Sequence, residues 1–228
     1  DLSENVIARH KVLYEGQTVA AVAANTTEIA EKAVALIDVE YEVLPHVIDV
    51  LEAMKEDAPL LHDDLFTGGV KPKPEKPSNV ANRVEFSLGN LETGFASADV
   101  VIEKNFTTQP VHQGYIEPHA VVADANPDGK VDIWCSSQGH FMVRTFISGL
   151  LKIDMSKIKV TAAEIGGGFG GKTTVYLEPL AVMLSSKAGR PVRMVMSREE
   201  VFRASGPTSG AAITVKIGAT KDGQIVAG

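Results

Sequence analysis

The apolar and polar residues near the N-terminus follow a strand pattern, then a helix pattern, then a strand pattern again. The apolar run 17–24 is typical of a buried strand, and Asn25 after it offers a side-chain oxygen that caps a helix. Apolar residues at helical spacing then predict a helix over 26–37. Segment 39–44 alternates apolar and acidic residues, which indicates a half-exposed strand that ends at Pro45. We therefore expect a compact strand–helix–strand unit here.

A stretch rich in proline and glycine follows this unit. Residues 57–82 combine both residue types with interleaved lysines, and such a segment sustains neither a helix nor a central strand. We therefore expect a linker at 61–80, between a first domain at 1–60 and a second domain at 81–228. The lysines between 71 and 76 are interpreted as solvated charges, because prolines and an acidic residue lie among them; a basic binding patch is the less favoured alternative.

The longer second region alternates between strand and helix patterns. Residues 126–129 (NPDG) are a turn signal between two strands, and residues 221–223 predict the turn of a final hairpin. Gly189 and Pro191 are typical of the end of a helix. Expected strands cover residues 84–88, 100–107, 115–123, 130–138, 158–163, 192–196, 211–217 and 224–227, and expected helices cover residues 139–151 and 173–187.

Composition and charge exclude several classes of function. The 228-residue chain has a formal net charge of −7, which argues against a general binder of nucleic acid or of anionic membranes. Cys135 is the only cysteine, so an intramolecular disulfide and a thiolate cluster for zinc or iron–sulfur are excluded. No apolar stretch approaches the roughly 20 residues of a membrane-spanning helix. The chain begins with Asp1 rather than Met and stops at Gly228 within an expected hairpin, so we expect a piece of a longer protein.

Residues 166–173 (GGGFGGKT), called the glycine loop below, carry the most prominent motif. Five glycines around Phe169 allow the backbone to turn sharply and to approach a ligand closely. The loop matches a P-loop in full and also fits a dinucleotide fingerprint, and both motifs hold phosphate at a helix N-terminus. A P-loop enzyme needs an acidic residue that ends a later strand, yet strand 192–196 is followed by Ser197. Glu199 lies too far past that strand to suit a dinucleotide fold. Nucleotide binding therefore stays open as the less favoured alternative.

Several other residues have side chains suited to a site. His112, Glu117 and His119 are candidate metal ligands, and the last two share one face of an expected strand. No complete ligand set is evident, so histidines with ordinary hydrogen bonds are the favoured interpretation. Cys135 is interpreted as a small core residue. Gln138 closes an expected strand and opens a helix, where a side-chain amide often points into a site.

Several blocks of the sequence resemble, in order, the molybdenum hydroxylases, the family of xanthine dehydrogenase, aldehyde oxidase and their bacterial three-subunit relatives. Residues 14–53 resemble the family's hammerhead domain. Residues 115–123 (YIEPHAVVA), 134–144 (WCSSQGHFMVR) and 164–174 (EIGGGFGGKTT) resemble the blocks that follow it, with 189–200 (GRPVRMVMSREE) behind them. The resemblance spans nearly the whole chain. It implies an α+β fold: a partial α/β-hammerhead, then part of a molybdopterin-binding domain with a mixed sheet.

The resemblance also implies a cofactor site at the glycine loop. Gly168, Phe169 and Gly170 would approach a molybdenum–molybdopterin cofactor, and the Gln138 side chain would hydrogen-bond an oxygen ligand of the metal. Amide N–H groups suit this role, because they are uncharged donors and metal oxo groups are acceptors. The family's catalytic base, a glutamate, would lie beyond Gly228, so no catalytic residue is expected within this chain.

Substrate and partners follow from the resemblance in the same way. Purine-oxidising members carry glutamate at the position of Thr173, so this substrate-pocket residue disfavours a purine and favours an aldehyde or an N-heteroaromatic compound. Iron–sulfur clusters and FAD would sit on partner subunits, in a cytoplasmic complex that we expect to be a dimer, with no nucleic acid and no membrane span. By itself the chain is expected to be inactive. A P-loop nucleotide-binding domain and a cofactor-free scaffold are the alternative hypotheses.

Overall fold

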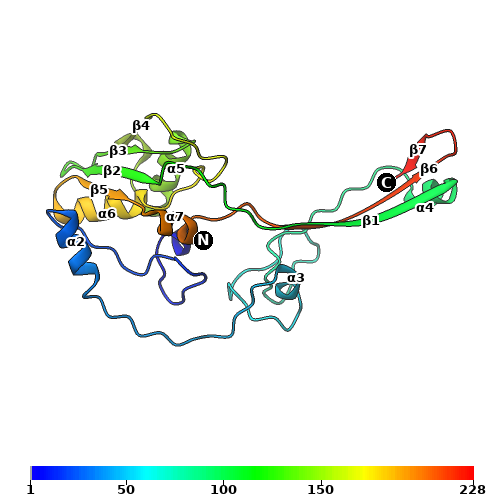
Figure 1. The fold of residues 1–228 in the computed structure, drawn as a ribbon, viewed down its shortest axis with the longest axis horizontal. Coiled ribbons are helices and arrows are strands. Elements are labelled where there is room, and N and C mark those ends of the chain that lie inside the picture. The colour runs from blue at the N-terminus through cyan, green and yellow to red at the C-terminus, as the bar shows by residue number, and fades with distance from the viewer. Residues whose placement is uncertain (1) are drawn as a thin grey trace. The chain divides into compact units, whose positions relative to one another are not determined.

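The computed structural model describes residues 2–228, and its packing divides the chain into two units. The first unit comprises residues up to 38 together with 108–211, and the second comprises 39–107 together with 212–228 (Figure 1). Each unit is therefore built from two separate segments of the chain. The sequence-based division into domains, with a linker at 61–80, stays a prediction.

A four-stranded mixed sheet forms the centre of the first unit. Its strand order is β4 (Ile158–Thr161), β3 (Val131–Cys135), β2 (Ala120–Ala125), β5 (Val192–Val195). Strands β3 and β4 run parallel, whereas β2 is antiparallel to both β3 and β5. The sheet confirms the α+β class with a mixed sheet and the existence of the expected strands of this region. The strand expected at 115–123 begins only at Ala120, however, so Glu117 and His119 precede β2 and do not share a strand face.

Two helices complete the core of the first unit. Helices α5 (His140–Leu151) and α6 (Glu178–Ala188) pack against the sheet and against each other. Alternate residues of β2 and β3 face these helices and are buried, as the period of a strand requires. The buried core includes Val121, Ala123, Ile133, Cys135, Val143, Ile147, Leu180 and Ala181. This core fixes the ends of β3 and β4, from which the candidate site is built.

Helix α6 begins later than the sequence pattern indicated. The expected helix over 173–187 begins only at Glu178, with Pro179 in its first turn, and it ends at Gly189 as predicted. Proline is favoured in a first turn because its missing N–H would have no helical partner there. Residues between the glycine loop and Glu178 are therefore irregular, so the loop does not run directly into a helix.

The remaining helices of the first unit are short. Helix α2 confirms the expected helix near the N-terminus, but Thr26 caps it in place of Asn25 by accepting a hydrogen bond from the Ile29 N–H at 3.2 Å. A capping box formed by Ser197 and Glu200 begins α7, a helix that was not expected from the apolar pattern. The bounds of these helices are α1 (Leu2–Val6), α2 (Thr27–Val34), η1 (Met155–Lys157) and α7 (Arg198–Ala204).

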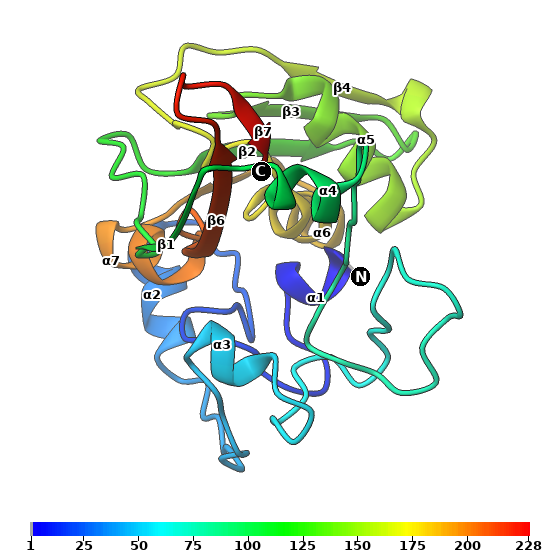
Figure 2. The ribbon, with the colours of Figure 1, turned by 90° about the vertical axis from the view of Figure 1, so that its right-hand side faces the viewer.

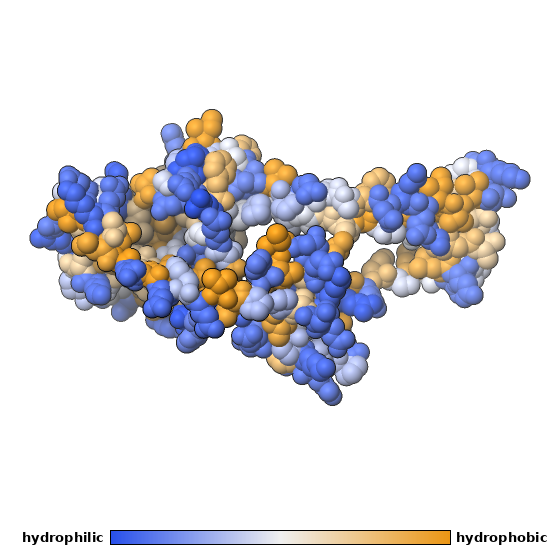
Figure 3. All heavy atoms as spheres, turned by 60° about the horizontal axis from the view of Figure 1, so that its bottom comes forward, coloured by the Kyte–Doolittle hydropathy of each residue, from blue (hydrophilic) through white to orange (hydrophobic). Residues whose placement is uncertain are grey.

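The second unit has a three-stranded sheet. Its order is β1 (Val100–Thr108), β6 (Ala211–Ala219), β7 (Ile225–Ala227), and β6 and β7 form the expected antiparallel hairpin (Figure 2). Helix α4 (Leu91–Ala96) packs against β7, and α3 (Val50–Ala53) precedes it in the chain. Both β1 and β6 are exposed along almost their whole length. Apolar side chains accordingly reach the surface around α4, β6 and β7 (right-hand side of Figure 3).

Three expected strands are wrong. Segments 17–24, 39–44 and 84–88 pair with no other strand among residues 2–228. Their apolar pattern predicted strands, but a strand exists only when a partner satisfies its backbone groups. In the last of these segments the apolar side chains stay exposed, with Phe86 at 88%.

All the helices described are short. The longest, α5, has 12 residues. Within residues 2–228, none combines the length and the apolar composition needed to cross a lipid bilayer.

Candidate functional site

The glycine loop lies at the edge of the sheet where β3 and β4 end. Strand β3 leads through residues 136–138 into α5, and β4 leads into the glycine loop and then towards α6. Because β3 and β4 are parallel, their carboxyl ends meet at one edge, the usual place for a ligand in such sheets. This topology brings Gln138 against the glycine loop, although the two are far apart in sequence.

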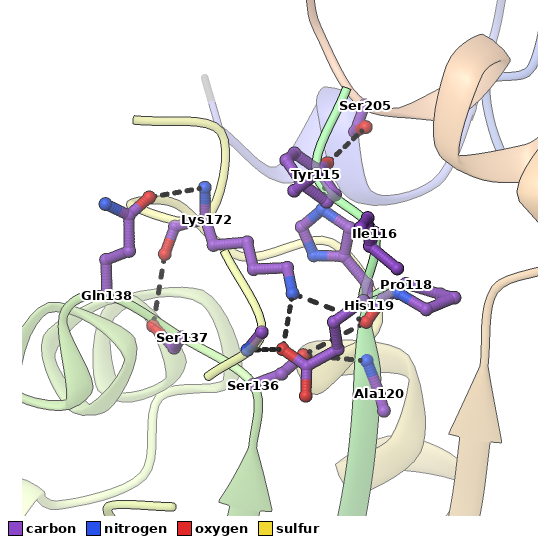
Figure 4. A network of polar contacts seen from close by, with 12 residues as sticks. Tyr115, Ile116, Pro118, His119, Ala120, Ser136, Ser137, Gln138, Lys172 and Ser205 are labelled. Atoms are coloured by element: carbon purple, nitrogen blue, oxygen red, sulfur yellow. Dashed lines mark hydrogen bonds and ion pairs between the residues drawn. The ribbon is translucent and has the colours of Figure 1, made fainter. Parts of the chain in front are cut away.

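The Gln138 side chain is fixed by the glycine loop. Its Oε1 accepts hydrogen bonds from the backbone N–H groups of Gly170 at 2.9 Å and Lys172 at 3.1 Å. Its own backbone N–H donates to the Lys172 carbonyl at 2.9 Å. These bonds determine which end of the amide is oxygen, since only oxygen accepts. The Nε2 group points away from Lys172, as Figure 4 shows, and it donates no hydrogen bond within residues 2–228, where the side-chain bonds of Gln138 are those accepted by Oε1. A positioned N–H donor is thus left for a ligand.

Two glycines of the loop have different surroundings: Gly168 packs against Gln138, and Gly170 faces open space. A Cβ atom at Gly168 would lie 2.5 Å from Oε1 of Gln138, so this position must be glycine for Gln138 to sit where it does. Gly170 has a φ of +90°, a backbone conformation that favours glycine, and a Cβ there would meet nothing within 4 Å. The loop is therefore packed against Gln138 on one side and open on the other.

Phe169 lies between these glycines in a strained and exposed conformation. Its φ is +49°, which is uncommon for a residue with a bulky side chain, and 73% of the residue is exposed. Such strain persists at sites where surrounding structure and function require it. An exposed aromatic ring held in this way is suited to cover a ligand.

The backbone donors of the glycine loop are divided between internal bonds and free groups. Gly170 and Lys172 donate to Gln138, and the Gly171 N–H donates to the Gly168 carbonyl at 2.7 Å. The N–H groups of Gly167, Gly168, Phe169 and Thr173 have no acceptor within the described part of the chain. Gly168 is buried and Phe169 is the exposed residue among these four, whereas the Gly170 N–H is committed to Gln138.

Lys172, which completed the P-loop motif, points into the protein. Its side chain has no exposed surface, and its Nζ lies 2.8 Å from Oε2 of Glu117 and 4.9 Å from the centre of the Tyr115 ring. A P-loop lysine instead reaches the phosphates, and the helix behind that loop begins immediately after it. Here the lysine is neutralised internally and α6 begins at Glu178. The geometry does not support the nucleotide-binding hypothesis.

The three candidate metal ligands have other partners. The carboxylate of Glu117 pairs with Lys172, His119 Nε2 lies 2.7 Å from the hydroxyl of Tyr115, and His112 Nε2 lies 3.1 Å from Ser205 Oγ. Burial, followed by the positive charge of Lys172, lowers the pKa of His119 to about 4, so this ring is neutral at pH 7. No group of three potential metal ligands occurs within residues 2–228. Both histidines thus have hydrogen-bond partners within the protein, which supports the favoured interpretation.

Thr173 and Cys135 complete the residues singled out in the sequence. The Thr173 hydroxyl donates to the Gly170 carbonyl at 2.9 Å, so its proton is committed to the loop and its lone pairs remain available as acceptors. Cys135 is buried in the core, and burial raises the pKa of its thiol to about 12. It is a core residue and not a nucleophile, as predicted.

A cavity of about 450 Å³ lies beyond the C-terminal end of the loop. Its lining includes neither Gln138 nor any residue of the glycine loop, so it is separate from the arrangement above. Its walls come from the N-terminal segment, from residues after the loop and from α7, and include Tyr14, Val175, Tyr176 and Phe202.

Comparison with known protein families yields two matches. The molybdopterin cofactor-binding domain matches residues 72–228, which contain Gln138 and the whole glycine loop. The hammerhead domain of aldehyde oxidase and xanthine dehydrogenase matches residues 1–45. The first match covers more than half of the chain.

Individual relatives agree with these matches. The chain is 34% identical to a probable hypoxanthine oxidase of Escherichia coli over 95% of its length, and 36% identical to the carbon monoxide dehydrogenase large chain of Afipia carboxidovorans over 97%. Among solved structures, it is similar to the aldehyde oxidoreductase of Desulfovibrio desulfuricans, with a TM-score of 0.80, 25% identity and 94% of the chain covered. The chain spans about a quarter of the length of these relatives: 25%, 28% and 23%, respectively.

Proposed function

This chain belongs to the molybdopterin cofactor-binding domain family, and on that premise we propose that it forms one wall of the cofactor site in a molybdenum-dependent hydroxylase. The enzyme would be of the xanthine dehydrogenase and aldehyde oxidase type. Gln138, Gly168, Phe169 and Gly170 would hold the molybdenum–molybdopterin cofactor. The observation that carries this proposal is the Gln138 amide, which is fixed through its oxygen and has its N–H₂ group free.

The residues present fit such a cofactor. An oxygen atom of the cofactor needs hydrogen-bond donors that do not compete for the metal. The Gln138 Nε2 group and the unpaired backbone N–H of the exposed Phe169 are uncharged donors of this kind. The open side of Gly170 leaves space for close approach. The ammonium group of Lys172 is buried and paired with Glu117, so it does not place a free cation in that space.

The residues of the candidate site have separate roles in this proposal. When bound, the cofactor supplies the two-electron oxidation that places a water-derived oxygen on the substrate carbon. Gln138 donates a hydrogen bond that orients the cofactor, and Phe169 covers it and limits the access of water. The catalytic base comes from outside residues 2–228. In support, the carboxylate of Glu117 is engaged by Lys172, and Glu178 is buried as the first residue of α6.

Thr173 supports an aldehyde or N-heteroaromatic substrate and disfavours a purine. Its side chain is neutral, and its hydroxyl proton is already donated to Gly170, so it presents an acceptor and no charge to a substrate. The relatives do not narrow this choice, since their names include both a hypoxanthine oxidase and a carbon monoxide dehydrogenase.

Partners and compartment are also part of the proposal. Iron–sulfur clusters and FAD would be carried by partner subunits, because this chain has a single, buried cysteine. One relative is described as a large chain and another as a large molybdopterin subunit, which supports assembly with other subunits. We expect a dimer of this complex in the cytoplasm.

Analysis of molybdenum and pterin tests the proposal. The protein that contains this chain should be produced with its partner subunits in a host that makes the cofactor. We expect about one molybdenum and one pterin per chain, and oxidation of an aldehyde or N-heterocycle. Tight Mg-ATP binding without molybdenum would contradict the proposal in favour of a nucleotide-binding domain. Absence of both ligands would contradict it in favour of a scaffold.

A further inference from the structure

We propose that Glu117 is a positioning residue of the cofactor site: one carboxylate that holds both ends of the glycine loop. This inference rests on the proposed function, and it assigns a task to a residue that the sequence suggested only as a metal ligand. Glu117 lies just before β2, and because β2 is antiparallel to β3, the start of β2 lies at the same edge of the sheet as the carboxyl end of β3.

Both ends of the glycine loop meet the same carboxylate oxygen. Oε2 of Glu117 accepts a hydrogen bond from the Gly166 backbone N–H at 2.8 Å and from Lys172 Nζ at 2.8 Å. The Glu117 backbone N–H also donates to the Gly166 carbonyl at 3.3 Å. A Cβ atom at Gly166 would lie 2.7 Å from the Cβ of Glu117, so the contact is close enough to require glycine there. The first and seventh residues of the loop are thus tied to one side chain.

The two members of the ion pair between Lys172 and Glu117 differ in burial. The Lys172 side chain is 0% exposed, whereas that of Glu117 is 34% exposed. A fully buried ammonium group needs a charged or polar partner, and within the described chain its other hydrogen bond goes only to the Pro118 carbonyl at 3.5 Å. His119 beside the pair is neutral and cannot replace the carboxylate. Glu117 is therefore the group on which the position of Lys172 depends.

Lys172 connects Glu117 to the second support of the loop, Gln138. Its Nζ reaches Glu117, its backbone N–H donates to Gln138 Oε1, and its carbonyl accepts from the Gln138 N–H and from Ser137 Oγ at 3.2 Å (Figure 4). Glu117 precedes β2, whereas Gln138 follows β3. Phe169 and the unpaired N–H groups of residues 167–169 lie between Gly166 and Gly170 in the chain, the residues held by Glu117 and Gln138 respectively. The placement of these groups against the cofactor is therefore set partly by Glu117.

Substitution of Glu117 by glutamine tests the role of its charge, because the size of the side chain and its hydrogen-bonding oxygen are kept. Glu117→Gln keeps the shape of the side chain and an oxygen acceptor for Gly166 but removes the charge that holds Lys172. In the holoenzyme we expect molybdenum content within twofold of the parent, a kcat lowered about 10- to 100-fold with KM little changed, and an altered Mo(V) EPR spectrum. In the cofactor-free protein we expect faster amide hydrogen exchange in peptides covering 164–173. Glu199→Gln, at an exposed ion pair with Arg203, is the matched control and should leave all of these quantities unchanged.

A double variant tests whether Glu117 only neutralises Lys172. Glu117→Gln combined with Lys172→Met removes both charges and should fold even where the single variant does not. If Glu117 positions the loop, the double variant keeps the altered EPR spectrum and the fast exchange. Parent-like spectra, kcat and exchange in the double variant would overturn the inference, as would a parent-like Glu117→Gln. Parent enzyme without molybdenum would instead overturn the proposed function, so the two failures are distinguishable.

Discussion

Oε1 of Gln138 lies 2.9 Å from the backbone nitrogen of Gly170, and this hydrogen bond orients the glutamine amide with its oxygen towards the glycine loop. The Nε2 group of the amide consequently faces away from this loop N–H group. In Gln138, Oε1 holds the loop and Nε2 is available to a ligand, so a substitution can remove one of these roles and keep the other.

Substitution of Gln138 by glutamate should remove the donor and keep the acceptor. The carboxylate still accepts from Gly170 and Lys172, so the loop should keep its conformation, but it offers no N–H to an oxygen of the cofactor. We expect turnover or cofactor occupancy of the intact enzyme to fall about 10- to 100-fold with little change in melting temperature. Gln138→Ala should lower both activity and the stability of the loop. Parent-like activity in the two variants would contradict the assigned role.

Alanine at Gly168 should displace Gln138. The added Cβ would lie 2.5 Å from Oε1 of Gln138, so one of the two must shift. We expect a loss of about 1–3 kcal/mol in the free energy of unfolding, measured by denaturant titration, together with loss of bound cofactor. Gly149→Ala in α5 is the control, because a Cβ there meets nothing within 4 Å and should stabilise the helix by about 0.5–1 kcal/mol. Equal effects at the two glycines would contradict the packing described.

Removal of the Phe169 ring should affect the cofactor more than the fold. Because most of the ring is exposed, Phe169→Ala removes little buried surface, and the free energy of unfolding should change by less than about 0.5 kcal/mol. Cofactor retention or turnover should nevertheless fall. Phe86→Ala, at an equally apolar and more exposed residue of the second unit, should change neither. A Phe169→Ala enzyme with parent-like turnover and occupancy would show that the ring does not cover the cofactor.

His119 should make the protein less stable in mild acid. Its pKa is about 4 in the folded chain and about 6.5 when exposed, so between these values the unfolded chain binds the proton more readily. Stability should therefore fall as the pH drops from about 6.5 to about 4, by about 3 kcal/mol from this residue. His119→Gln should flatten that part of the curve of unfolding free energy against pH. An unchanged slope in the variant would contradict the burial of a neutral imidazole.

Much of the framework could be predicted from the sequence, because it depends on local patterns. The strands around the NPDG turn at 126–129, the helix after Gln138 and the final hairpin each carry a period or a turn signal of their own. The resemblance to molybdenum hydroxylases rested on ordered blocks, and the family match confirms it. By contrast, segments 17–24, 39–44 and 84–88 have strand-like composition but no strand partner within residues 2–228, and composition does not reveal a partner.

The details of the site could not be predicted, because they depend on contacts between distant residues. Lys172 completed a phosphate-binding motif in the sequence, yet its ammonium group is paired with Glu117, which is 55 positions away. Which loop N–H groups remain free also depends on Gln138, whose oxygen occupies those of Gly170 and Lys172. One local signal could have been recognised in the sequence: Ser197 and Glu200 have the spacing of a capping box, and they begin α7.

The central claim is that the Gln138 amide donates a hydrogen bond to an oxygen atom of the cofactor. Pulsed EPR of the Mo(V) state, on enzyme with ¹⁵N in its glutamine side chains, measures this contact directly. We predict a coupling to an exchangeable proton and to ¹⁵N in the parent enzyme, and loss of both in Gln138→Glu at measurable molybdenum content. Identical couplings in the two enzymes, or none in the parent, would contradict the account.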